Sequence, residues 1–222
     1  MARRLRTPGC GWRALDGGAA VRVAPLPARP AQPGGGFGVL LRIPAVRIGL
    51  AVIVLVVTAH FAAYTYVRPA LEHFAGFGAT ELAVMLLVYG IFGVAGNFAS
   101  GAGAQRSARR TLLVLAGGIG IALLGVQFVG TTTLGSALTT ALWGAAYGGL
   151  SVCGQILTAQ TAPEHRESVT GLYVGVFTAS IASGAFVGGV VIDHSGLPML
   201  LWLSAAVAIA GVALATRVPA AT

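Results

Sequence analysis

Of the four histidines in this 222-residue chain, His60 alone stands well inside a long apolar stretch, with Tyr64 one helical turn further on. A neutral imidazole both donates and accepts a hydrogen bond, and it can take up a proton near neutral pH. Such a group is costly inside a membrane and usually faces a cavity or a polar partner. Two interpretations therefore stand. His60 contacts a substrate or a proton, or it is a neutral imidazole hydrogen-bonded to a neighbouring helix.

A second set of side chains recurs every four residues and would form one slowly drifting stripe on a helix. The set is Trp143, Tyr147, Ser151 and Gln155. Aromatic walls with a few polar groups suit partly apolar organic molecules. The stripe is interpreted as one wall of a substrate cavity, with packing against another helix as the alternative.

The spacing of the charges indicates how these residues are held. Of the chain, 56% is hydrophobic and only 9% charged, and the mean hydropathy is +0.84, which is typical of an integral membrane protein. A bilayer core needs about 20 apolar residues per helix. Charge-free runs, the longest divided at a Gly-bounded polar stretch at 130–135, predict six transmembrane helices. These spans are 48–67, 82–102, 111–129, 135–159, 168–192 and 197–216.

The arginines predict the orientation. All 14 basic residues are arginine, and with six spans thirteen of them fall on one face and only Arg68 on the other. The positive-inside rule places the thirteen in the cytoplasm, together with both termini. The net charge of +8 is thus attributed to topology and to contact with anionic lipid headgroups, and no nucleic-acid partner is expected.

Two regions follow from this pattern. Residues 1–45 are rich in Arg, Pro and Gly and lack apolar periodicity, which predicts a cytoplasmic tail or linker. Residues 46–217 are predicted to form the six-helix transmembrane domain, so the fold class is all-α membrane protein.

Several segments, in order, resemble a known family. They are LLRIP at 40–44, HFAAYTYVRPAL at 60–71, residues 90–110, LWG at 142–144 with Gln155, and SIASGAFVGG at 180–189. Together they resemble the carboxy-terminal six-helix half of a major facilitator superfamily transporter, in the twelve-helix drug, sugar and small-metabolite efflux branch. This resemblance implies that the helix carrying Trp143 to Gln155 lines the substrate cavity.

The resemblance also implies a cytoplasmic gate and a moving surface. The gate motif would comprise Asn97, Gly101, Gln105, Arg106, Arg109 and Arg110, with Gln105 where the family usually has Asp and Ala108 where it has Gly. Gln still forms hydrogen bonds but carries no charge, so the contact that holds the gate closed is expected to be weakened. A face of small residues permits close backbone approach and would be the rocking surface. It comprises Gly175, Ser180, Ser183, Gly184, Gly188 and Gly189.

The implied function is secondary active efflux of a small organic solute, such as a drug or sugar, across the cell membrane. A full carrier places its substrate site between two six-helix halves. We therefore expect a truncated or split half-carrier that lacks its amino-terminal half. The alternative is a non-transporting half-carrier, either an inert fragment or a membrane scaffold. No carboxylate lies inside a predicted span, so a proton-carrying acid would belong to the other half.

An enzyme is not expected. A rhomboid-type protease needs a G-x-S-G serine and a histidine on a later helix, whereas residues 181–184 lack the first glycine and the last span has no histidine. The metalloprotease motif H-E-x-x-H is absent as well. Neither a cofactor nor a metal site is predicted.

Overall fold

The computed structural model of the chain describes residues 37–218, and the regular structure within that range is entirely helical. Most of the predicted tail at 1–45 therefore lies outside the described residues. The elements are α1 (Phe37–Leu40), α2 (Pro44–Tyr64), α3 (Val67–Ala75), α4 (Ala79–Phe128), α5 (Thr133–Gly148), α6 (Leu150–Thr161), a 3-10 turn (Pro163–His165) and α7 (Arg166–Ala215). Helical structure is expected of apolar spans, because each backbone N–H and C=O must find a partner within its own segment.

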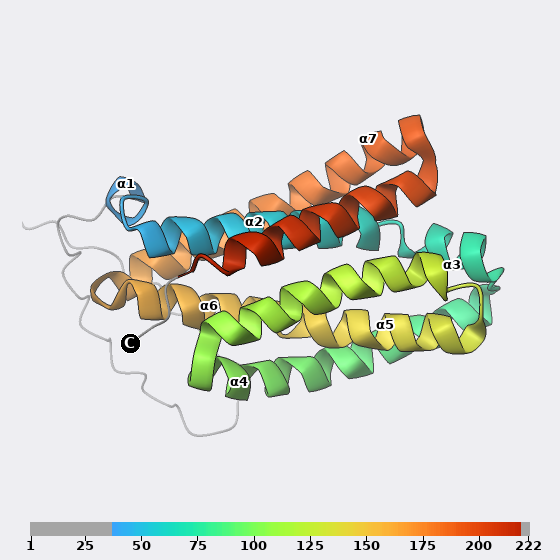
Figure 1. Ribbon diagram of the computed structural model, residues 1–222, viewed down its shortest axis with the longest axis horizontal. Coiled ribbons are helices and arrows are strands. Elements are labelled where there is room, and N and C mark those ends of the chain that lie inside the picture. The colour runs from blue at the N-terminus through green and yellow to red at the C-terminus, as the bar shows by residue number, and fades with distance from the viewer. Residues whose placement is uncertain (1–36, 219–222) are drawn as a thin grey trace, which may run out of the picture. The chain divides into compact units, whose positions relative to one another are not determined.

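Helices α4 and α7 each reverse direction partway along, so each consists of two arms (Figure 1). In α4 the break is Ser107, which is extended (φ −160°, ψ 95°) and accepts a hydrogen bond from the Arg110 N–H at 3.4 Å. In α7 the break is Gly196, whose φ of 78° is readily adopted only by glycine. Pro198 follows in the first turn of the second arm, where a missing N–H costs nothing. The arms are residues 79–106 and 108–128 in α4, and 166–195 and 197–215 in α7.

The chain turns at residues 129–132, which overlap the first half of the polar stretch at 130–135 whose composition predicted a turn. Helix α4 ends at Phe128 and α5 begins at Thr133. The side chain of Thr132 caps α5 by accepting a hydrogen bond from the Gly135 N–H at 3.1 Å. Helices α5 and α6 meet at Gly149, which keeps a right-handed helical backbone (φ −86°, ψ −13°), so they follow one another closely.

Helix α3 was not predicted. It is short and carries Arg68 and Glu72, whose side chains form an exposed i,i+4 ion pair at 2.8 Å. The hydrogen bond that Arg68 donates to Glu72 raises the pKa of the guanidinium. Gly76 ends the helix in the left-handed conformation (φ 67°). A charge-spacing argument treats such a segment as a loop, because charged residues interrupt its apolar pattern.

Three helical segments in the described residues are long and apolar enough to cross a membrane: Pro44–Tyr64, Ala79–Phe128 and Pro163–Ala215. The chain is thus a multi-pass membrane protein of helical class. Two of these segments contain the reversals at Ser107 and Gly196.

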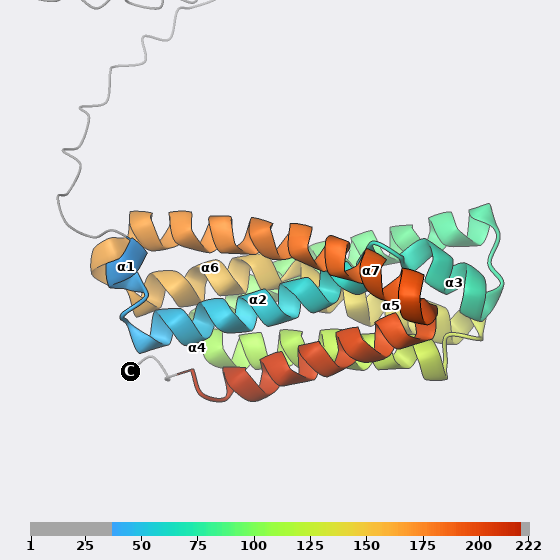
Figure 2. The same cartoon turned by 90° about the horizontal axis from the view of Figure 1, so that it is seen from above.

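Glycines bring the helices into backbone contact. A Cβ placed on Gly96 would overlap the Ala145 carbonyl, so the first arm of α4 touches α5 directly. Figure 2 shows α2 between the two arms of α7, and a Cβ on Gly184 or on Gly211 would lie 2.6 Å from atoms of α2. Between apolar helices in lipid, such close approach supplies the packing energy that exclusion of water supplies in a soluble protein.

We expect Gly96→Ala to lower the stability of the purified protein. The added methyl group collides with backbone, which cannot move aside like a side chain, and overpacking of this kind costs about 1–3 kcal/mol. The measurement is the midpoint of thermal unfolding in detergent. Gly90→Ala is the matched control, because Gly90 lies on the same arm and its Cβ would meet nothing within 4 Å. Equal midpoints for the two variants would contradict the packing argument.

Candidate substrate site

Six aromatic rings from three helices meet in one cluster. We call it the aromatic cluster: His60, Phe61 and Tyr64 on α2, Tyr89 on α4, and Trp143 and Tyr147 on α5. The imidazole of His60 stacks on the Tyr147 ring, with centroids 3.7 Å apart and planes within 1°. Tyr64 stacks on the same imidazole with a centroid separation of 5.2 Å. The predicted pair on α2 and the first half of the predicted stripe on α5 are thus in contact.

His60 accepts a hydrogen bond at Nδ1 from the indole N–H of Trp143, at 2.9 Å. The indole nitrogen can only donate, so Nδ1 carries no proton in this pair, and the proton of the neutral imidazole is assigned to Nε2. His60 is fully buried and Trp143 is 1% exposed. The bond corresponds to the second of the two interpretations of His60, a neutral imidazole bonded to a neighbouring helix.

Two polar atoms of the cluster remain without a partner among the described residues. They are His60 Nε2 and the hydroxyl oxygen of Tyr89, both buried. Buried polar atoms in native proteins are nearly always hydrogen-bonded, so each such exception needs an explanation. Sequence reasoning missed Tyr89. The available signal was a tyrosine near the middle of the charge-free run at 82–105.

The second half of the predicted stripe continues on α6 and becomes steadily more accessible. Ser151 is half-buried, and its carbonyl accepts a hydrogen bond from the Tyr173 hydroxyl at 3.1 Å. Gln155 is exposed, and its side-chain amide lies 3.5 Å from the Ser151 hydroxyl. The stripe therefore runs from the closed aromatic cluster at Trp143 to an open surface at Gln155.

The predicted gate residues lie on both sides of the Ser107 break. Asn97 donates its side-chain amide to the Gly148 carbonyl at 3.2 Å, which joins α4 to the end of α5. Arg109 donates to the carbonyl of Thr216, beyond the end of α7, where orphan carbonyls favour a cation. Within residues 37–218 the remaining members form no side-chain hydrogen bond with a distant element: Gly101, Gln105, Arg106 and Arg110.

The predicted small-residue face is divided between two environments. Gly184 and Gly188 are buried, and a Cβ on either would lie 2.6 Å from a carbonyl oxygen of α2. Ser180 is buried as well, and its carbonyl accepts a hydrogen bond from Thr58 at 3.4 Å. The other three members do not reach the α2 backbone: Gly189 approaches the Tyr66 hydroxyl, while Gly175 and Ser183 are exposed.

Within residues 37–218 no group of three or more His, Cys, Asp or Glu side chains could hold a metal ion. Cys153 is a buried free thiol whose sulfur lies 3.3 Å from the Ala108 carbonyl.

The bundle of long apolar helices is the architecture of a multi-pass membrane protein. Residues 53–221 match the family described as Major Facilitator Superfamily, and the chain belongs to that superfamily. The family predicted from the sequence motifs is thereby confirmed.

The chain is also similar to a curated relative. It is 27% identical over 183 residues to a protein of Mannheimia succiniciproducens named "Probable sugar efflux transporter". The match covers 81% of this chain and 46% of that protein, so the chain spans about half the length of the curated relative it matches.

A double-mutant cycle on His60→Leu and Trp143→Phe tests the buried hydrogen bond. We expect a coupling free energy of about 0.5–1.5 kcal/mol between the two substitutions, since either one alone removes the bond. The measurement is reversible unfolding in mixed micelles. A control cycle combines His60→Leu with Trp202→Phe. Trp202 is 45% exposed, and its ring contacts Phe128 and not His60. A coupling no larger than that of the control cycle would show that the bond contributes nothing.

Proposed function

We propose that this chain forms one side of the substrate pathway of an efflux carrier for small, neutral, hydroxyl-bearing organic solutes. The observation that carries the proposal is the pair of buried, unpartnered polar atoms, His60 Nε2 and the Tyr89 hydroxyl, within the aromatic cluster. A site with polar groups of this kind strongly favours a ligand that supplies the missing hydrogen bonds. Solute hydroxyls can do so for both atoms.

The surrounding rings support the same substrate class. Tyr64 and Tyr147 both stack on the imidazole, and aromatic walls with a few polar groups suit partly apolar organic molecules. The name of the relative refers to sugar efflux, and sugars combine hydroxyls with apolar faces. Gln155, exposed at the far end of the stripe, would contact solute where the pathway opens.

The proposed topology has six membrane crossings, with both termini in the cytoplasm of a cell-membrane protein. The two arms of α4, the two arms of α7, the α5 and α6 pair and α2 would each cross once. The Ser107 break, flanked by Arg106 and Arg109, would lie on the cytoplasmic side.

A second six-helix half is required to close the pathway, because in carriers of this family the substrate lies between two halves near the membrane midplane. The partner half would supply the opposite wall and any carboxylate that couples transport to protons. A half-carrier that does not transport, acting as a scaffold, is the alternative, and the flux experiment below distinguishes the two.

The flux experiment uses liposomes that contain the chain alone, or the chain together with the amino-terminal six-helix half of the sugar efflux relative. We expect flux of radiolabelled sugars only with both halves. Gln155→Ala should lower the rate about tenfold, the effect of one lost hydrogen bond of about 1.4 kcal/mol. Gln160→Ala is the matched control, because Gln160 is an equally exposed glutamine on α6, away from the stripe. Absence of flux in every preparation would favour the scaffold.

The topology is tested by cysteine labelling in a background lacking Cys10 and Cys153. Glu164→Cys and Asp193→Cys place thiols on exposed positions near opposite ends of the first arm of α7. A membrane-impermeant maleimide added to intact cells should label position 193 alone, and lysis should make position 164 reactive. Labelling of both positions in intact cells would contradict a single crossing between them.

A further inference from the structure

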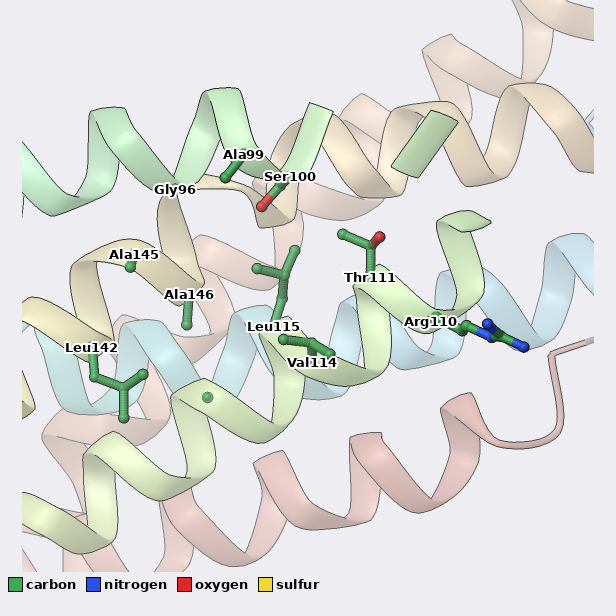
Figure 3. A pocket seen from close by; sticks show the side chains of 11 residues that line it. Gly96, Ala99, Ser100, Arg110, Thr111, Val114, Leu115, Leu142, Ala145 and Ala146 are labelled. Carbon is green, nitrogen blue, oxygen red and sulfur yellow. The ribbon is translucent and has the colours of Figure 1, made fainter. Parts of the chain in front are cut away.

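An apolar groove lies between the two arms of α4 and helix α5, away from the aromatic cluster. Its volume is about 390 Å³, within the range typical of ligand sites. Figure 3 shows Ala99 on one arm, Val114 on the other, and Leu142, Ala145 and Ala146 along α5. None of these residues belongs to the aromatic cluster, so the groove is separate from the proposed substrate site.

One end of the groove carries a basic side chain. Arg110 lines it there, while Arg106 lies just before the Ser107 break and Arg109, just after it, donates to the Thr216 carbonyl. No acidic residue occurs anywhere from residue 101 to residue 148, which includes the whole second arm and α5. Arg109 and Arg110 stand in the first turn of the second arm, where the helix dipole disfavours cations unless an anion is present. The charge at this end is therefore complementary to an anionic group.

The surface next to the groove is apolar and open. Phe98 is 76% exposed, Val114 is 72% exposed and Ile121 is 63% exposed. Along the second arm the groove extends from Arg110 to Gly118, a rise of about 12 Å. An occupant thus needs one anionic end and a hydrocarbon portion that reaches inward from it. A phospholipid meets both requirements, and basic pockets between helices on the cytoplasmic side are suited to anionic headgroups.

We propose that this groove binds one anionic phospholipid, with an acyl chain between the arms of α4 and the headgroup phosphate at Arg110. A zwitterionic lipid of the same chain length binds less tightly, because its ammonium group offsets the attraction between its phosphate and the arginine. The bound lipid fills the space between the two arms of α4 and α5.

The charge requirement is tested with the full-length chain in nanodiscs of equal parts phosphatidylcholine and phosphatidylglycerol. After transfer to detergent, native mass spectrometry measures how much of each lipid is retained. Phosphatidylglycerol should be retained in preference to phosphatidylcholine. Arg110→Gln should lower its retention about fivefold, the effect of one cation at the membrane surface, and Arg110→Lys should preserve most of it. Arg166→Gln is the control, because Arg166 is equally exposed but lies at the start of α7, outside the groove.

The acyl-chain requirement is tested by filling the groove. Ala99→Phe should abolish retention of phosphatidylglycerol, whereas Ala102→Phe should not, since Ala102 is exposed on the same arm but does not line the groove. Equal retention of the two lipids by the unsubstituted chain would overturn the proposal. Equal losses for Arg110→Gln and Arg166→Gln would overturn it too, by showing general surface attraction. Unchanged retention of phosphatidylglycerol by Ala99→Phe would overturn the proposal as well. Exchange of Arg110 or Ala99 affects surface side chains, so folding is preserved and is checked by gel filtration.

Discussion

Direct backbone contact at glycine is the constraint on which the rest of this structure depends. In lipid, apolar side chains gain nothing by leaving the solvent, so helices associate through close packing and a few polar bonds. Gly96 and Gly144 allow the first arm of α4 to touch the α5 backbone, and Gly184 and Gly188 do the same for α7 on α2. Because these contacts leave no room for a methyl group between the backbones, they bring together the helices that carry the aromatic rings.

The hydrogen bond between His60 and Trp143 joins the two groups of helices that the glycines assemble. One partner lies on α2, which packs with α7, and the other lies on α5, which packs with α4. The bond uses only one side of the imidazole and leaves Nε2 buried and unpartnered. The structural role of His60 thus uses one nitrogen, and the proposed contact with solute would use the other.

Sequence reasoning predicted the helical class, the superfamily and the turn before α5, because apolar runs and short motifs are local signals. It did not predict α3, whose charges resemble those of a loop, nor the contribution of Tyr89, which depends on helices distant in sequence. The stripe from Trp143 to Gln155 is one row in sequence, but Trp143 is 1% exposed while Gln155 is exposed. Periodicity assigns residues to a helix face, whereas burial depends on which other helices cover that face.

The contact between Thr58 and Ser180 spans 122 residues, and this separation has a consequence during synthesis. At about 5–20 residues per second, α2 leaves the ribosome ~6–24 s before the part of α7 that covers it. During that interval the surface of α2 that packs on α7 lacks its α7 contacts, whereas Trp143 on α5 is synthesised earlier. The order of synthesis therefore allows the hydrogen bond between α2 and α5 to form before α7 can pack on α2.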